Sequence, residues 1–148
     1  GESAGATLVL DIPLMAKAAG IPNPAAVIAM SPVTDAIAVE EGTVLEGLDS
    51  SDQVLEVYAP GHDKADPLIS PALGDLTGFP PTFLSVGSTE ILLKDSLTFA
   101  RNAAKAGCDV RLHVGKDMIH TYPLDLWDYP EAMTAFEEME LFLRQILR

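Results

Sequence analysis

Gly1-Glu2-Ser3-Ala4-Gly5 opens the chain, followed by the apolar run Ala6-Thr7-Leu8-Val9-Leu10. The first five residues match G-x-S-x-G, the nucleophile-elbow pattern, in which a serine sits on a sharp turn from a strand into a helix. Glycines suit this turn because a side chain two residues before or after the serine is expected to collide with neighbouring backbone. We therefore expect a buried helix to follow and to hold the Ser3 hydroxyl clear of the backbone. A flexible Gly/Ser tail is the alternative interpretation.

The composition is that of an ordinary globular protein. Of the 148 residues, 48% are hydrophobic and 21% charged, and no apolar run approaches the length of a membrane span. The net charge of −13 disfavours nucleic acid and anionic membrane surfaces as partners. Cys108 is the single cysteine, so it forms no intrachain disulfide and cannot build a metal site by itself. We take the cytoplasm as the expected location.

Strands and helices alternate along the sequence. Residues 26–30 are a short continuous apolar run, suited to a strand buried on both faces, and residues 82–86 are expected to form a second buried strand. Residues 110–114 alternate apolar and polar side chains, as an edge strand does. A helix is expected over residues 4–19, where Pro13 must kink it or end its first segment. The order favours an α/β fold with a mostly parallel sheet flanked by helices.

Three more helices are expected. A short one is placed near Asp52–Tyr58. The second carries an apolar face and ends at Gly107, and the third is a long amphipathic helix at the C-terminal end. The residues assigned to these two apolar faces are Leu93, Leu97, Ala100 and Ala104, and Met133, Phe136, Met139, Leu143 and Ile146.

Three parallel strands do not complete a domain of this kind, and an elbow needs a strand directly before it. We therefore expect residues 1–148 to be the C-terminal half of a single catalytic domain, whose N-terminal half lies outside this sequence.

A serine hydroxyl becomes a good nucleophile when an imidazole takes its proton and a carboxylate fixes the imidazole tautomer. His113 lies inside the predicted edge strand, where a solvated or packed side chain is expected. His62 lies in a carboxylate-rich loop, residues 61–66, that offers metal ligands as an alternative. His120 follows the last strand, which is where the histidine partner of an elbow serine belongs.

The acid is expected just past the strand at residues 82–86, because the partners follow in the order serine, acid, histidine. Glu90 is the first carboxylate there, three residues beyond Gly87. Asp95 is the second candidate, but it lies further along, in the predicted helix, and should point away from the strand ends.

Further motifs accompany the opening pentapeptide: Ser31-Pro32-Val33-Thr34-Asp35, Asp66-Pro67-Leu68-Ile69-Ser70-Pro71, Phe79-Pro80-Pro81-Thr82, Val86-Gly87-Ser88 and Asp117-Met118-Ile119-His120. With these motifs the chain resembles the bacterial esterases related to hormone-sensitive lipase, which have the α/β-hydrolase fold. The resemblance covers nearly all of the sequence. The family usually has Asp where Glu2 stands.

The resemblance implies a role for each candidate. Ser3 looks like the nucleophile, His120 the general base, and the Ala4 backbone amide one oxyanion donor. Glu90 occupies the place of the family acid, which is usually Asp. The other oxyanion donors of the family come from a His-Gly-Gly motif upstream of the elbow, so they and the cap over the acyl pocket are expected outside this chain.

The activity that the resemblance implies is hydrolysis of short-chain or aryl esters, without a cofactor and without a metal. A homodimer through residues 110–114 or the C-terminal helix is expected, because the outer edge of that terminal strand has unpaired backbone groups, and this is consistent with the resemblance. Two alternatives remain. The type-B carboxylesterases also carry Gly-Glu-Ser-Ala-Gly and a glutamate acid, but the spacings of 87 and 30 residues from Ser3 to Glu90 to His120 and the proline motifs argue against them. A non-catalytic ligand-binding protein on the same fold is the second, and the presence of His120 argues against it.

Overall fold

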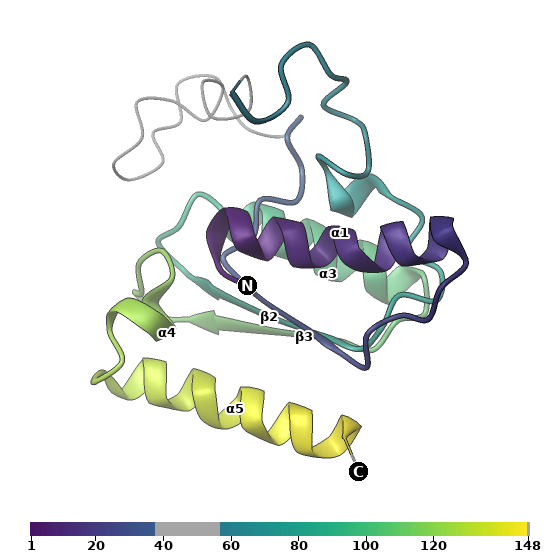
Figure 1. Cartoon of the computed structure of the whole chain (residues 1–148). Coiled ribbons are helices and arrows are strands. Elements are labelled where there is room, and N and C mark those ends of the chain that lie inside the picture. Colours follow the sequence, from purple (N-terminus) through teal and green to yellow (C-terminus); the bar gives the residue numbers. More distant parts are fainter. Residues whose placement is uncertain (38–56, 148) are drawn as a thin grey trace.

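The computed structural model describes residues 1–37 and 57–147 (Figure 1). The helices and strands, in chain order, are α1 (Ser3–Ala19), β1 (Val27–Met30), the 3-10 turn η1 (Pro71–Leu73), β2 (Thr82–Gly87), α3 (Leu93–Lys105), β3 (Val110–Gly115), α4 (Tyr122–Asp125) and α5 (Pro130–Ile146). The short helix expected near Asp52–Tyr58 falls largely outside the described residues. None of the helices in these two ranges has the length and apolar character needed to cross a membrane.

The three strands form one parallel sheet in the order β1-β2-β3. β2 lies in the centre and every residue of it is buried, Thr82 and Ser85 included, which confirms the expected buried strand. Val27 pairs with Thr82, and Thr82 pairs with Val110, so the strands start level with one another. Their carboxyl ends therefore meet at one edge of the sheet. The predicted α/β class and the three strands are confirmed.

Helices cover both faces of the sheet. α1 and α3 lie on one face and α5 on the other (Figure 1). The side chains of β2 divide accordingly, since Leu84 packs in the cluster with Leu10 and Phe99, whereas Phe83 packs in the cluster with Phe142 of α5. α1 passes through Pro13 without ending, which removes one of the two outcomes expected for that proline.

The apolar faces assigned to α3 and α5 are partly wrong. In α3 the buried side chains are Asp95, Ser96, Phe99 and Ala103, whereas Leu97 is half exposed and Ala104 exposed. Asp95 is buried because backbone N–H groups donate to it, so a polar side chain occupies a position that periodicity assigns to an apolar one.

In α5 the buried side chains are Ala132, Ala135, Met139 and Phe142, with Leu143 and Ile146 packed beside them. Met133 and Phe136 are exposed. The two alanines pack in the cluster that contains Phe83 of β2. The larger side chains one position further round the helix therefore stay outside the contact.

Candidate active site

The opening residues form the turn that the sequence predicts. Glu2 makes a parallel bridge with Met30 at the end of β1, and the Met30 N–H donates to the Gly1 carbonyl at 2.9 Å. The backbone is extended at Glu2 and turns into α1 at Ser3, whose φ of +49° lies in the left-handed region. A non-glycine residue there is strained and is held by its surroundings. This geometry is that of a strand-to-helix elbow and excludes a flexible tail.

The two glycines of the pattern differ in their surroundings. A Cβ on Gly1 would lie 2.3 Å from the Gly5 carbonyl oxygen, so the expected collision exists there. A Cβ on Gly5 would meet no described atom within 4 Å beyond its chain neighbours and the backbone of its own helix. The collision expected at both glycines is therefore confirmed at Gly1, and within the described residues its prediction at Gly5 is wrong.

Ser3, His120 and Glu90 are joined by two hydrogen bonds. Ser3 Oγ lies 2.9 Å from His120 Nε2, and His120 Nδ1 lies 2.6 Å from Glu90 Oε2. Glu90 follows β2 and His120 follows β3, so the parallel sheet brings them together at its carboxyl edge. Figure 1 shows the strand arrowheads, the start of α1 and α4 on this same side of the molecule.

Both oxygens of the Glu90 carboxylate have partners. Oε1 accepts hydrogen bonds from Ser31 Oγ at 2.8 Å and from the Gly87 N–H at 2.5 Å, while Oε2 faces the imidazole. The side chain is only 2% exposed, against 32% for His120. The acid is therefore fixed and shielded, whereas the histidine is partly exposed.

The surroundings of His120 favour its protonated form. The hydrogen bond with Glu90 raises the pKa of His120 above its ordinary value, and partial burial opposes this rise. The negative charges of Glu90, Glu2 and Asp125 raise the pKa of His120 further. An imidazolium formed by proton transfer is therefore stabilised where it forms.

The loops that carry the acid and the histidine are held against each other. Thr89 Oγ1 donates to the Met118 carbonyl at 2.6 Å, and the Asp117 N–H donates to Ser88 Oγ at 2.8 Å. A Cβ on Gly87 would lie 2.2 Å from the same Met118 oxygen, so only glycine permits this close approach. Apart from Thr89, the residues in these contacts belong to the motifs Val86-Gly87-Ser88 and Asp117-Met118-Ile119-His120, in which only His120 had a predicted role.

Asp95, the second candidate acid, has a different environment. Its Oδ2 accepts hydrogen bonds from the N–H groups of Thr34 at 2.8 Å and Asp35 at 3.4 Å. Burial raises the pKa of Asp95 to about 6, although these backbone hydrogen bonds lower it. The side chain anchors the segment after β1 to α3, whereas the carboxylate beside His120 is that of Glu90.

The other two histidines take no part in this cluster. His113 Nδ1 lies 2.8 Å from Glu138 Oε2 and its ring stacks on Tyr122, which agrees with a packed side chain in a strand. His62 is exposed, and within residues 1–37 and 57–147 no group of three or more His, Cys, Asp or Glu side chains is placed to hold a metal ion. Cys108 Sγ donates to the Leu76 carbonyl.

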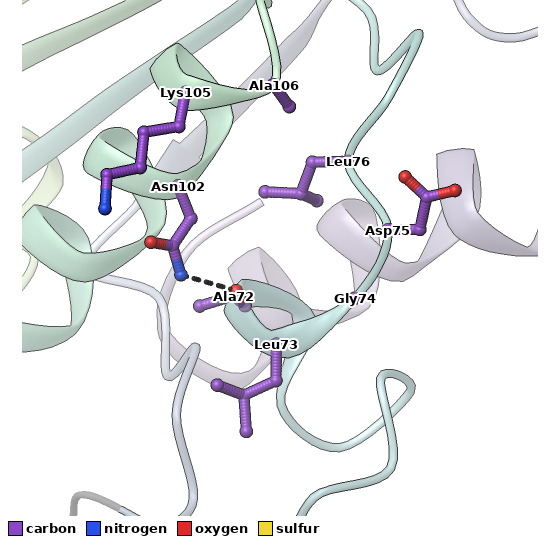
Figure 2. A pocket seen from close by; sticks show the side chains of 8 residues that line it. All are labelled: Ala72, Leu73, Gly74, Asp75, Leu76, Asn102, Lys105 and Ala106. Carbon is purple, nitrogen blue, oxygen red and sulfur yellow. Dashed lines mark hydrogen bonds between the residues drawn. The ribbon is translucent and has the colours of Figure 1, made fainter.

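A separate pocket lies between η1 and α3 (Figure 2). The Asn102 side-chain amide donates to the Ala72 carbonyl at 2.8 Å within it, and Asp75 and Lys105 also line it. None of Ser3, Glu90 and His120 lines this pocket. It is therefore distinct from the hydrogen-bonded cluster.

Comparison with known proteins places this arrangement in a family. A family model described as alpha/beta hydrolase fold matches residues 1–124. An acetyl-hydrolase of Streptomyces hygroscopicus is 37% identical over 97% of this chain and 50% of its own length. An esterase of Acinetobacter venetianus is 32% identical over 96% of this chain and 50% of its own length.

Solved structures agree. An esterase from the bacterial hormone-sensitive lipase family superposes with a TM-score of 0.85 at 32% identity, covering all of this chain and 52% of that one. A hormone-sensitive-lipase homologue from a metagenome library gives 0.86 at 32% identity, covering 99% of this chain and 53% of that one. The chain thus spans about half the length of the curated relatives that it matches. It belongs to the α/β-hydrolase fold family, on the branch of the bacterial esterases related to hormone-sensitive lipase.

Proposed function

We propose that the protein carrying this chain hydrolyses carboxylic esters of short acyl chains through a serine acyl-enzyme. The observation that carries the proposal is the unbroken series of hydrogen bonds from Ser3 Oγ through His120 to Glu90. The names of its relatives, an acetyl-hydrolase and an esterase, support the same chemistry. A similar structure, 29% identical, was soaked with p-nitrophenyl butyrate, which supports short acyl chains.

The geometry gives each residue a step. Ser3 Oγ attacks the ester carbonyl carbon while His120 Nε2 takes its proton, and Glu90 holds the Nδ1–H tautomer and stabilises the imidazolium. The carbon–oxygen bond to the alcohol then breaks, and His120 returns the proton to the leaving alkoxide. Water repeats the sequence on the acyl-enzyme, releasing the acid and restoring Ser3.

The negative oxygen of each tetrahedral intermediate needs hydrogen-bond donors. Ala4 follows Ser3 in the first turn of α1, where backbone N–H groups have no acceptor within the helix. We assign the Ala4 N–H as one donor. The remaining donors and the cap that shapes the acyl pocket belong, in this proposal, to the part of the protein that precedes Gly1.

The proposal that the remaining oxyanion donors and the cap precede Gly1 has a testable consequence. The outer edge of β1 pairs only with Gly1 and Glu2 among the described residues, and Leu8, Ile12 and Met15 of α1 are about half exposed. Residues 1–148 expressed alone should therefore be insoluble or inactive, since apolar surface and a strand edge are uncovered. Cooperative unfolding together with ester hydrolysis by residues 1–148 alone would contradict this proposal.

The main test uses a fluorophosphonate probe, which reacts with activated serines. The full-length protein should hydrolyse p-nitrophenyl acetate or butyrate and should be labelled at Ser3, and Ser3→Ala should lose both properties. A non-catalytic binding protein on the same fold would bind small esters without labelling. Absence of both hydrolysis and labelling in the folded wild-type protein would rule out the proposal.

A homodimer and a cytoplasmic location remain predictions. β3 pairs only with β2 within the described residues, which leaves its outer edge unpaired there, and α5 exposes Met133 and Phe136. We propose that two copies associate through β3 or α5. A monomer mass by light scattering of the full-length protein at micromolar concentration would count against this.

A further inference from the structure

Ser31 is a buried serine in an unusual conformation. It follows β1 directly, its exposed fraction is 0%, and its N–H donates to the Ser85 carbonyl at 2.7 Å. Its φ of +51° lies in the left-handed region, which glycine adopts at lower cost than serine. Glycine would suit this backbone but would supply no hydroxyl, so the contacts of the Ser31 hydroxyl need an explanation.

The Ser31 hydroxyl connects the two loops of the candidate site. It donates to Glu90 Oε1 at 2.8 Å, and it accepts a hydrogen bond from the Thr121 N–H at 3.2 Å. Thr121 is the residue after His120 and is itself held at a φ of +52°. The Ser31 hydroxyl thus donates a hydrogen bond to the acid and accepts one from the backbone N–H of the residue after the base.

We propose that Ser31 is a positioning residue, whose hydroxyl fixes the Glu90 carboxylate and the His120 loop relative to each other. The proposal rests on the esterase function proposed above. Ser31 acts through Glu90 and the Thr121 backbone, and does not itself touch the Ser3 hydroxyl. Because the loop after β1 supplies this contact, all three strands of the sheet contribute to the geometry of the cluster.

Removing the hydroxyl has two effects. Oε1 of Glu90 keeps only the Gly87 N–H as a described donor, so the carboxylate can rotate away from Nδ1 of His120. The buried Thr121 N–H loses its described acceptor, which frees the backbone beside the base. Small displacements of a catalytic group slow the chemical step steeply, so kcat should fall by about 10- to 100-fold. KM should change by less than about twofold, since binding groups stay in place.

The test compares variants of the full-length protein. Ser31→Gly removes the hydroxyl and suits the positive φ, and Ser31→Ala removes it while keeping Cβ. Ser96→Ala is the matched control, because Ser96 is also buried and its hydroxyl has no hydrogen-bond partner among the described residues. The control should keep the wild-type kcat and KM.

A double-mutant cycle separates positioning from a general structural role. In a Glu90→Gln background, where the acid no longer works, Ser31→Gly should reduce kcat by less than about threefold, because both changes disable the same unit. An equal loss in both backgrounds would overturn the proposal, as would an unchanged kcat in Ser31→Gly.

Folding outcomes also decide the question. If kcat falls in Ser31→Gly while its unfolding temperature stays within a few degrees of wild type, the result supports the proposal. If neither Ser31 variant folds, the hydroxyl has a structural role and the proposal is overturned. Wild-type hydrolysis and labelling of Ser3 report separately on the esterase function. The Ser31 inference can thus fail while that function stands, and it falls with the function if wild type is inactive.

Discussion

Glu90 Oε2 lies 2.6 Å from His120 Nδ1, between two residues 30 positions apart in the sequence. The contact depends on parallel pairing of β2 with β3, which places the two following loops side by side. With Nδ1 occupied by the acid, Nε2 is left to face Ser3 Oγ at 2.9 Å. The orientation of one imidazole therefore links the fold to the proposed chemistry.

Exchange of the two candidate acids for amides should separate their roles. Glu90→Gln keeps the shape of the side chain but no longer fixes the imidazole tautomer, so kcat/KM for p-nitrophenyl butyrate should fall by roughly two to four orders of magnitude, with the serine-protease case as the upper guide. Asp95→Asn keeps a carbonyl oxygen for the Thr34 N–H and should change kcat/KM by less than about tenfold. The reverse pattern would make Asp95 the acid.

The pH dependence should report the titration of His120. The imidazole must be neutral to accept the Ser3 proton, so kcat/KM should rise with pH through the pKa of His120. Because Glu90 raises that pKa, the rise should be centred above histidine's ordinary value of about 6.5. In Glu90→Gln the residual activity should rise at lower pH than in wild type. A flat profile between pH 5 and 9 would rule out His120 as the base.

The strands, their parallel arrangement and the order of the candidate residues could be predicted from the sequence, for a clear physical reason. Residues 82–86 contain no charged side chain, as is typical of a buried central strand, and the apolar run after Gly5 favours a nucleophile elbow over a chance match of G-x-S-x-G. Glu90 and His120 follow successive strands, and consecutive parallel strands of βαβ units usually lie side by side. The two residues are therefore expected at the same edge of the sheet.

What the sequence did not predict concerns side chains whose burial depends on distant partners. Asp95 is buried in α3 because the Thr34 backbone, 61 residues earlier, donates to it, and no local pattern contains that information. The exposure of Met133 and Phe136 follows from alanines on the neighbouring face of α5. Ser31 belonged to a recognised motif, but its contacts with Glu90 and Thr121 appear only when three loops meet.

Two phenylalanines on α5 test the corrected face of that helix. Phe142 is fully buried against the sheet and Phe136 is 40% exposed. Phe142→Ala should lower the free energy of unfolding by about 3–5 kcal/mol, through lost burial and the cavity left behind. Phe136→Ala should lower it by less than about 1 kcal/mol if the exposed face is uncovered in the full-length protein. Urea unfolding of both variants measures the difference, and equal losses would mean that another part of the protein or a second copy covers Phe136.

Asp11 should make the stability of the protein depend on pH. The residue is 4% exposed, and its Oδ1 has no hydrogen-bond partner among the described residues. Burial raises the pKa of the Asp11 carboxyl to about 7, and the negative charge of Asp66 adds to this rise. At a pH between the ordinary pKa of an aspartate, near 4, and this raised pKa, the folded state binds the proton more tightly than the unfolded state does. Stability should therefore fall as pH rises from about 4 to 7, because the buried group must then ionise.

Asp11→Asn removes that titration while keeping the size of the side chain. The free energy of unfolding of the variant, measured relative to wild type, should increase from about pH 4 to about pH 7. Above about pH 7 this difference should stay constant. A difference on the order of 1–2 kcal/mol is expected there, since solvent penetration reduces the full cost of burying a charge. Asp109→Asn, at an exposed aspartate, is the matched control for the loss of one carboxylate. The check is urea unfolding at pH 4, 6 and 8, and an Asp11→Asn difference that does not grow with pH would show that Asp11 stays ionised in the folded protein.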